Sequence, residues 1–431
     1  MNSFSRYREC AFSDPETIRD IQENLLREHL AYCLDNSSYY RGILERSGIG
    51  CKNATLDDLP RLPLTDKSHI ERYSEALCAV PPSKIVDIVL SSGTTGIPTR
   101  IIYTDHDLKR LAYNEEKSLE GCGITADDTV LLTCTMDRCF IAGLAYFLGI
   151  RSIGAAAIRN GLNSLESHAE MILRLSPTAI IGVPTFLRKL GLFLKNRGID
   201  PASTTVTKLV CIGEPLRNKD LDPLPVGESL EDLWRAGAYS TYASSETVTS
   251  FCECTARQGG HLNPDLAIVE IIDENGIVLP PGEVGEIVLT PLGMEAMPLI
   301  RFQTGDVSFL ITEPCSCGRF SPRLGPILGR KKQMMKVRGT TLYPQAIYAA
   351  LEEMPAVTDY YVVATSQTEL SDEITVYAAV KEPSCTAEHI RDKLQARLRV
   401  RPAVVIASEE VIKQRIYTPE SRKPVFFIDR R

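Results

Sequence analysis

The first 75 residues carry apolar side chains at helical spacing. Between residues 18 and 34 these side chains recur every three or four positions and form one stripe on a helix: Ile21, Leu25, Leu26, Leu30 and Cys33. A turn with two prolines follows at residues 59–63, and Thr65-Asp66-Lys67 has the polar residues that begin a helix. The pattern predicts a helical lead-in over residues 1–75.

From about residue 80, short β-branched runs alternate with helical stretches. The runs predict buried strands over residues 85–90, 130–133, 178–182 and 208–212, with helices over residues 164–175 and 185–195. Strands and helices that alternate at this spacing form parallel sheets with helices on both faces.

From residue 265 onward the pattern of apolar and polar residues changes. Residues 265–312 are strand-like, with a turn at residues 280–282, and from residue 331 helices are predicted over 342–354 and 386–398 and strands over 359–364, 373–380 and 404–407. We therefore predict an α/β fold with a large domain over residues 1–330, whose mostly parallel sheets are covered by helices and which is β-rich from about 250 to 320. A small α+β domain follows over residues 331–431.

Composition narrows the functional class. The 431 residues are 44% hydrophobic and 24% charged, which is typical of a globular protein, and the net charge of −7 argues against a nucleic-acid partner. No apolar run approaches the roughly 20 residues of a membrane span, and the first ten residues lack the apolar core of a signal peptide. Thirteen cysteines, an odd number, suit a reducing compartment, so we expect a cytoplasmic protein.

A glycine- and hydroxyl-rich stretch directly follows the run at residues 85–90. It consists of Ser91, Ser92, Gly93, Thr94, Thr95 and Gly96. Glycines let the backbone curve, and hydroxyls with free N–H groups can surround a phosphate. The spacing is not that of the P-loop, and by itself such a stretch is equally consistent with a polar turn.

Further motifs follow in a fixed order. They are Gly213-Glu214-Pro215, Tyr242-Ala243-Ser244-Ser245-Glu246, Glu253-Cys254, Pro298-Leu299-Ile300-Arg301-Phe302, Thr304-Gly305-Asp306, Cys317-Gly318-Arg319, Gly329-Arg330, Lys336-Val337-Arg338-Gly339 and Tyr343-Pro344. In this order, from about residue 55 to the end, the chain resembles the adenylate-forming enzymes, and among them most closely the phenylacetate-CoA ligases.

The resemblance implies a role for each motif. It assigns ATP or AMP binding to Ser91, Ser92, Gly93, Thr94, Thr95, Gly96, Gly213, Glu214, Pro215, Tyr242, Ala243, Ser244, Asp306 and Arg330. The first six would hold the β- and γ-phosphates, Glu214, Pro215 and Tyr242 would line the adenine, and Asp306 and Arg330 would bind the ribose. Ser245 would contact phosphate or carboxylate, and Glu246 would hold Mg²⁺, which favours carboxylate and phosphate oxygens.

The resemblance also implies a mobile small domain. Lys423, in the Ser421-Arg422-Lys423 stretch, would be the catalytic lysine that bridges the substrate carboxylate and the α-phosphate. Lys332 would be the hinge about which the domain turns between the two half-reactions, and Gly339 would border the CoA thiol.

Some residues depart from the family pattern. Ile97 stands where many relatives have lysine, and Ala243 replaces a glycine. Lys332-Gln333 replaces an Asp-Asp pair. Residues 136–146 lack the glycine-rich aromatic phrase and the histidine of phenylacetate ligases, so the acid need not be phenylacetate.

Cysteines and a histidine form a second constellation. Two cysteines one residue apart, a histidine seven residues later and another cysteine pair some 50 residues further could close a tetrahedral Zn²⁺ site. The predicted ligands are Cys254, His261, Cys315 and Cys317, with Cys252 as the alternative. Four protein ligands leave no open position, so this zinc would be structural. The alternative is reduced cysteines packed as small apolar residues.

The leading hypothesis is an ATP-dependent carboxylate–CoA ligase that uses Mg²⁺ and CoA and acts on a small carboxylic acid, aryl or arylacetic. One alternative is an adenylating enzyme that passes the acyl group to a carrier protein or another acceptor. Another is a degenerate nucleotide-binding sensor. The resemblance leaves a homodimer open.

Overall fold

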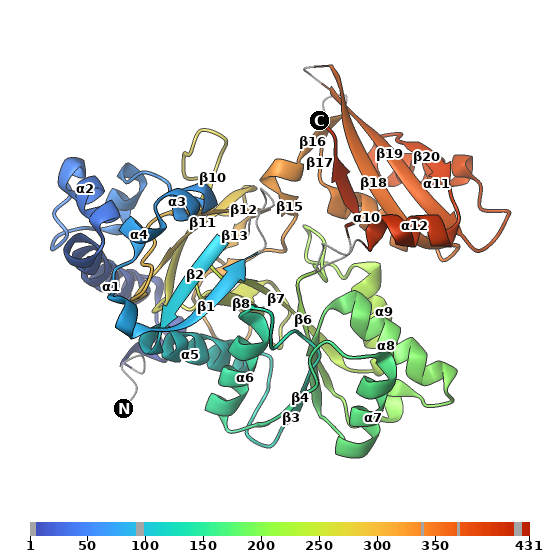
Figure 1. Cartoon of the computed structure of the whole chain (residues 1–431), viewed down its shortest axis with the longest axis horizontal. Helices are drawn as coiled ribbons and strands as arrows, with labels where there is room; N and C mark the ends of the chain where they lie inside the picture. Colours follow the sequence, from blue (N-terminus) through green and yellow to red (C-terminus); the bar gives the residue numbers. More distant parts are fainter. Residues whose placement is uncertain (1–5, 92–98, 338–339, 369–370, 418–424) are drawn as a thin grey trace. The chain divides into compact units, whose positions relative to one another are not determined.

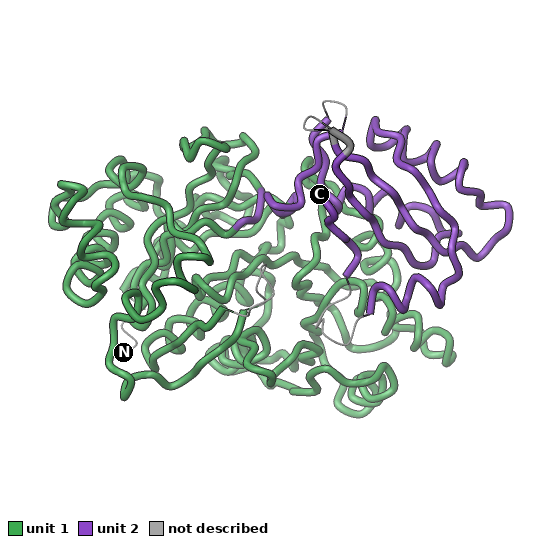
Figure 2. Tube along the Cα trace, turned by 45° about the horizontal axis from the view of Figure 1, so that its top comes forward, with its two compact units in different colours: residues 1–304, 308–327 green, residues 305–307, 328–431 purple. Residues whose placement is uncertain are grey.

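The structure, a computed structural model, describes residues 6–91, 99–337, 340–368, 371–417 and 425–431. The chain divides into two compact units (Figure 2). Unit 1 comprises residues 1–304 and 308–327, and unit 2 comprises residues 305–307 and 328–431.

Unit 1 begins with one long helix and three shorter ones. They are α1 (Pro15–Asn36), α2 (Ser38–Ser47), α3 (Lys67–Arg72) and α4 (Ser74–Leu77). α1 starts earlier than its apolar stripe because Asp14 accepts a hydrogen bond from the Thr17 N–H at 2.9 Å and Pro15 occupies the first helical position. The buried side chains of α1 include Leu26, Leu30 and Cys33, which belong to the predicted stripe.

A nine-stranded sheet forms the centre of unit 1. Its order is β13-β14-β9-β8-β7-β6-β5-β3-β4. The parallel part consists of β4 (Ala156–Arg159), β3 (Thr129–Leu132), β5 (Ala179–Gly182), β6 (Lys208–Ile212) and β7 (Gly237–Ser244). The antiparallel part continues with β8 (Thr249–Glu253), β9 (Gly260–His261), β14 (Arg323–Leu324) and β13 (Leu310–Ile311).

Helices cover both faces of the parallel part. Leu131 and Ile180 pack with residues of α7 (Leu165–Leu175), α8 (Pro184–Asn196) and α9 (Pro225–Trp234). The adjacent residues Val130 and Ile181 pack instead with the end of α5 (Asp105–Gly121) and with α6 (Ala142–Ile153). Figure 1 shows these two groups of helices on opposite sides of the strands. Both faces are therefore apolar, as expected for a parallel sheet.

The predicted strand over residues 85–90 forms, but the prediction that it is a buried strand of the parallel sheet is wrong. Residues 85–90 lie in β1 (Ile85–Ser91), but β1 pairs antiparallel with β2 (Thr99–Thr104) in a separate two-stranded sheet. Val86 and Ile88 are exposed rather than buried. The reason is the short connection, since a parallel neighbour needs a crossover of about a dozen residues or more.

The strand-like residues after 265 form an antiparallel arrangement. β10 (Ala267–Ile272) pairs with β11 (Gly285–Pro291), and the predicted turn lies between them with Gly282 at φ +83°. The division between the units falls within β12 (Phe302–Ser308). The part of β12 in unit 2 pairs antiparallel with β15 (Gly329–Arg330).

Unit 2 is an α+β unit around a four-stranded sheet. The order β20-β19-β18-β21 comprises β20 (Ala403–Ile406), β19 (Ser371–Val380), β18 (Val357–Thr368) and β21 (Phe427–Asp429). One core includes residues of α10 (Pro344–Glu352) and α11 (Ala387–Leu398), and a smaller one includes residues of α12 (Glu409–Ile416). A hairpin of β16 (Met335–Val337) and β17 (Thr340–Leu342) precedes them. Each of the five elements predicted after residue 330 overlaps one of these.

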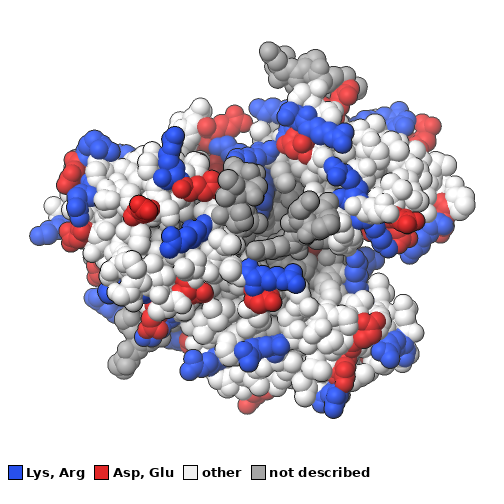
Figure 3. Space-filling model, in the orientation of Figure 1, with Lys and Arg blue, Asp and Glu red and all other residues white. Residues whose placement is uncertain are grey.

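Among the described helices, none combines the length and the apolar character that crossing a membrane requires. Lys and Arg side chains are interspersed with Asp and Glu on the face drawn in Figure 3.

Candidate functional site

The base of the predicted phosphate loop is a β-hairpin. Ser91 ends β1 and pairs with Thr99, which begins β2. The Ser91 hydroxyl is buried and has no hydrogen-bond partner among the residues that the structure describes. The predicted phosphate-binding residues Ser92, Gly93, Thr94, Thr95 and Gly96 lie outside the described part of the chain.

Two adjacent parallel strands bring the predicted adenine residues to one sheet edge. Ile212, the last residue of β6, is paired with Thr241 of β7, so Gly213, which follows β6, and Tyr242, which lies near the end of β7, are at the carboxyl ends of neighbouring strands. That edge is where α/β sheets bind ligands. Gly213 has a φ of +77°, which turns the chain away from the strand. The Tyr242 ring stacks on Phe251 of β8, with centroids 6.0 Å apart.

The Glu214 side chain serves the scaffold. Its two carboxylate oxygens accept hydrogen bonds from the Thr185 N–H at 3.0 Å and the Thr185 hydroxyl at 2.9 Å. Thr185 lies in the first turn of α8, where free N–H groups attract an anion. The carboxylate therefore fixes the loop that contains Gly213 and Pro215 to a helix N-terminus.

Glu246 is a buried anion with an internal counterion. The Ser244 hydroxyl donates to its Oε2 at 2.7 Å, and the Lys67 ammonium lies 2.8 Å from its Oε1. Burial by itself would raise the pKa of Glu246, but Lys67 and Ser244 outweigh it and hold the pKa below its ordinary value. Apart from Lys67, no described group is bonded to Oε1, and a hard cation would fit that oxygen.

Hydrogen bonds from buried side chains hold the backbone around Glu246, which includes one strained residue. The Ser245 carbonyl accepts a 2.7 Å hydrogen bond from the Tyr103 hydroxyl, and the side chain of Ala243 is exposed. Val248 has a φ of +50°, which is unusual for a β-branched residue. The fully buried Arg110 donates to the Val248 carbonyl. Such strain persists only where the surroundings impose it, and it clusters at functional sites.

The predicted ribose residues face each other within unit 2. Asp306 and Arg330 are partners in the β12–β15 pair, and the Arg330 Nε lies 3.4 Å from the Asp306 Oδ1. Gly305 before them has a φ of +77°. Lys332 has an exposed side chain in a short 3₁₀ turn, and its carbonyl accepts a 3.1 Å bond from Arg431. Gly339 and Lys423 lie outside the described residues.

Sequence reasoning missed Lys67 as a member of this site. The Thr65-Asp66-Lys67 stretch signals only a helix start, and Lys67 is the first residue of α3. No spacing rule relates it to Glu246, because the two residues are 179 positions apart and meet only through folding.

The four predicted metal ligands converge in unit 1. The ligand atoms of Cys254, His261, Cys315 and Cys317 all lie within 4.8 Å of one another. The Cys254 and Cys315 sulfurs are 3.7 Å apart, and the Cys317 sulfur is 3.5 Å from the His261 Nε2. A tetrahedron with Zn–S bonds of about 2.3 Å has S–S edges of roughly 3.8 Å, so the geometry fits zinc.

Cys252 is not in this cluster. It pairs with His261 in the β8–β9 ladder, but its thiol interacts with that of Cys122, and this contact and burial raise its pKa. The cluster residues are themselves mostly buried: burial raises the pKa of Cys254 to about 12 and lowers that of His261 to about 3. Burial also opposes ionisation of Cys317, yet hydrogen bonds from Arg319 and neighbouring thiols keep its pKa below the ordinary value.

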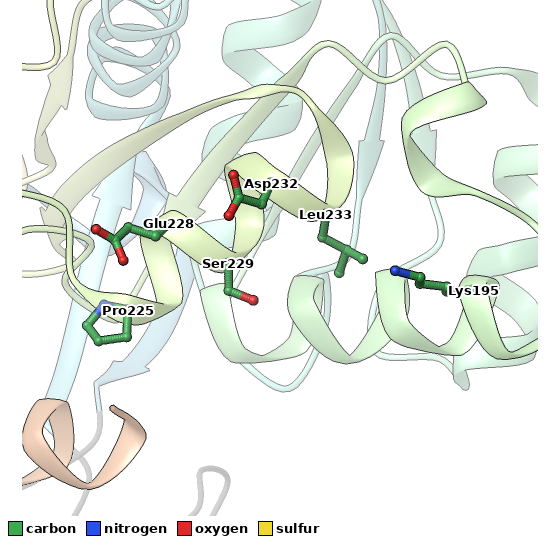
Figure 4. A pocket seen from close by; sticks show the side chains of 6 residues that line it. All are labelled: Lys195, Pro225, Glu228, Ser229, Asp232 and Leu233. Carbon is green, nitrogen blue, oxygen red and sulfur yellow. The ribbon is translucent and has the colours of Figure 1, made fainter. Parts of the chain in front are cut away.

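A separate hollow of about 430 Å³ lies between α8 and α9 (Figure 4). Its lining residues are Lys195, Pro225, Glu228, Ser229, Asp232 and Leu233. None of the predicted site residues lines it, and four of its six side chains are polar or charged. Ligand pockets are mostly apolar, so we assign no role to this hollow.

Comparisons with known proteins agree with the motif order. The family model of AMP-binding enzymes matches residues 35–294, and that of the AMP-binding enzyme C-terminal domain matches residues 339–431. The phenylacetate-coenzyme A ligase of Thermus thermophilus is 32% identical over 85% of this chain and 82% of its own length. The Escherichia coli enzyme of the same name is 25% identical over 92% of this chain and 91% of its own length.

Solved structures show the same fold. A 2-hydroxyisobutyryl-CoA ligase in the postadenylation state matches 99% of this chain and 92% of its own, with a TM-score of 0.86 at 21% identity. An anthranilate CoA ligase bound to anthranoyl-AMP matches 79% of this chain and 65% of its own, with a TM-score of 0.60 at 17% identity.

Proposed function

The chain belongs to the AMP-binding enzymes and is an ATP-dependent, AMP-forming carboxylate–CoA ligase; on that premise we propose that its substrate is an aryl or arylacetic acid. The relatives that support this are phenylacetate-coenzyme A ligases. Residues 136–146 lack the glycine-rich aromatic phrase and the histidine of the phenylacetate ligase pattern, so the acid need not be phenylacetate itself.

The chemistry requires two steps at one acyl carbon. A carboxylate is a poor electrophile because its negative charge repels nucleophiles. In the first step a carboxylate oxygen attacks the α-phosphorus of ATP, and pyrophosphate leaves. In the second step the CoA thiol, losing its proton, attacks the acyl carbon of the acyl adenylate, and AMP leaves with the electron pair of the broken C–O bond.

We propose the following roles for the chain. Gly213, Pro215 and Tyr242 hold the adenine at the carboxyl ends of β6 and β7, with Glu214 bracing their loop against α8. Glu246 holds Mg²⁺, which when bound neutralises charge on the triphosphate. Asp306 and Arg330 bind the ribose, as acceptor and donor respectively.

Lys423 would bridge carboxylate and α-phosphate in the first step, and Gly339 would border the thiol in the second. Both lie in the C-terminal residues, and we propose that these turn as a domain about Lys332 between the steps.

The observation that carries the nucleotide assignment is the buried, ionised Glu246 two residues after β7, next to the strand that leads into the Gly213 loop. The test is pyrophosphate release against a panel of carboxylic acids, with and without CoA. Aryl and arylacetic acids should give the fastest release, and CoA should increase it.

Two controls sharpen this test. Glu246→Gln should lower release by about 10²- to 10³-fold, whereas Glu228→Gln, an exposed glutamate of the α8–α9 hollow, should not change it. Fastest release with small hydroxy acids would contradict the aryl assignment. Release that is indifferent to CoA would contradict CoA as the acceptor and favour a carrier-protein thiol.

We also propose that the four-residue cluster binds structural Zn²⁺. Its support is the convergence of three thiols and one imidazole at tetrahedral distances. Metal analysis of purified protein should find about one zinc per chain, and a well-folded, metal-free sample would contradict the proposal.

We also propose that the protein is cytoplasmic and that it forms a homodimer. The location is supported by the thirteen cysteines, all of which are free thiols. Light scattering on the purified protein tests the oligomeric state.

A further inference from the structure

The loop before α3 is pinned to the strand segment that precedes Asp306. The Thr65 N–H donates to the Arg301 carbonyl at 3.0 Å, and the Gln303 N–H donates to the Thr65 carbonyl at 2.7 Å. The buried Thr65 hydroxyl also donates to the Ile300 carbonyl at 2.9 Å. Three hydrogen bonds therefore fix the backbone two residues before Lys67.

α3 is tied on its other side to the base of the phosphate hairpin. The Thr99 hydroxyl donates to the Glu71 carboxylate at 2.9 Å, and Thr99 is paired with Ser91. Lys67 and Glu71 are four residues apart in α3, so they lie on the same helix face. Lys67 is thus held between the hairpin base and Glu246.

We propose that Lys67 is a cation of the nucleotide site: its ammonium neutralises Glu246 when nucleotide is absent and moves onto the triphosphate when Mg²⁺·ATP binds. The inference rests on the proposed role of Glu246 as the magnesium ligand. Mg²⁺ on the Oε1 that Lys67 contacts would repel the ammonium, and the phosphates that arrive with the metal offer it new acceptors.

The exposure of Lys67 distinguishes it from a structural ion pair. The Arg301–Glu270 pair of the same unit is enclosed, with 3% and 9% of the side chains exposed, and Arg301 also donates to the Pro60 and Leu62 carbonyls. Lys67 is 25% exposed and only its partner is deeply buried. A flexible four-carbon stem with an accessible ammonium can exchange acceptors, whereas an enclosed guanidinium cannot.

The experiment compares Lys67→Met with Lys67→Arg and with the matched control Lys84→Met. Lys84 also pairs with a glutamate, Glu295, but its side chain is 59% exposed and lies outside the proposed site. For each protein, calorimetry measures ATP binding with and without Mg²⁺. Pyrophosphate exchange then gives the adenylation rate and the half-saturating Mg²⁺ concentration, and acyl adenylate supplied with CoA isolates the thioester step.

Lys67→Met should change two quantities in a way that damage to the fold would not. The adenylation rate should fall by about tenfold to a hundredfold because the triphosphate loses a cation. The half-saturating Mg²⁺ concentration should fall by about two- to fivefold, because the metal no longer competes with a partly exposed ion pair. The thioester step should stay within about twofold of wild type, since pyrophosphate has already left.

Lys67→Arg should recover part of the adenylation rate, and Lys84→Met should match wild type throughout. An unchanged adenylation rate and Mg²⁺ requirement in Lys67→Met would overturn the proposal. So would an equal loss in both steps together with a lower melting temperature.

Failure of this inference and failure of the ligase assignment are distinguishable. If no acid supports exchange in the wild-type protein, the ligase assignment fails, but calorimetry still compares the Mg²⁺ dependence of ATP binding in the two proteins. ATP binding that responds identically to Mg²⁺ in wild type and Lys67→Met would overturn the role of Lys67 alone.

Discussion

Two sites in unit 1 contain buried ionisable groups, and the two differ in what compensates their charge. At the proposed nucleotide site the Glu246 carboxylate is matched by a cation from the chain itself, the Lys67 ammonium at 2.8 Å. At the Cys/His cluster three thiols and an imidazole converge, and burial raises the pKa of Cys254 and lowers that of His261. Both shifts disfavour the charged forms of these two groups, and a bound metal ion would reverse the shift at the Cys254 thiol.

The Lys67–Glu246 pair is complete within the fold, whereas the Cys/His cluster needs an added ion. An anion paired within the chain is stable without ligand and can exchange its partner when substrate arrives. A set of thiols becomes a strong structural element only after deprotonation on a metal. Substitutions at each kind of site test this difference, and loss of a metal ligand is expected to destabilise the protein most.

Cys254→Ser should remove a ligand of the cluster and with it the metal. The expected loss of unfolding free energy is on the order of 5 kcal/mol or more, a part of the roughly 10–16 kcal/mol that structural zinc gives small domains. Metal analysis and denaturant unfolding measure it. Cys252→Ser, two residues earlier in the chain and still within β8, is the control and should keep its zinc. Equal metal content in both variants would contradict the assigned ligand set.

Arg301→Met should destabilise the fold around residues 60–65, the segment that precedes Lys67. It leaves Glu270 buried without its partner and removes the donor to the Pro60 and Leu62 carbonyls, at an expected cost of about 3–5 kcal/mol. Denaturant unfolding measures the loss. The double variant Arg301→Met/Glu270→Met should recover part of it because no unpaired charge remains. A single variant as stable as wild type would show that residues 60–65 are not held by this pair.

Asp128→Asn tests a partly buried ion pair to which we assign no ligand. The Lys208 ammonium lies 2.9 Å from Asp128, and although burial raises the pKa of this carboxyl, bonds from Thr178 and Lys208 hold it below its ordinary value. A lowered folded-state pKa stabilises the protein above the unfolded-state pKa, and this contribution disappears as the pH falls through the folded-state value.

The variant should therefore lose about 0.5–1.5 kcal/mol near neutral pH and show a shallower loss of stability toward acid. Adenylation and its Mg²⁺ dependence should not change, in contrast to the Lys67 variants. Denaturant unfolding as a function of pH is the measurement, with the exposed Asp127→Asn as the control. A changed Mg²⁺ requirement would mean that ion pairs in this unit affect the site without contact.

Much of the fold follows from local pattern. The run at residues 208–212 coincides with β6, and the helix predicted over 164–175 begins at residue 165 because Ser164 caps it. Apolar periodicity and capping residues act within one element, so sequence reveals them. The pairing and burial of β1 depend on which strand lies beside it, and the prediction of a buried strand in the parallel sheet was wrong.

The candidate site likewise combines features that the sequence reveals with features that only the folded structure shows. Motif order identified the family, and spacing selected Cys254, His261, Cys315 and Cys317 because residues that share one ion leave a pattern of chemical types along the chain. Cys252 stayed an alternative in the sequence, and only the tertiary structure directs its thiol to Cys122 instead.

Residue types and their order along the chain were enough to predict the fold class, the family and the residue types of both sites. The packed structure was needed to see which groups neutralise one another: Lys67 with Glu246, and Glu214 with the N-terminus of α8. The physical reason is that a counterion has to match its partner in position and burial rather than in sequence spacing. Such a partner leaves no periodicity, and it is visible only when distant segments pack together.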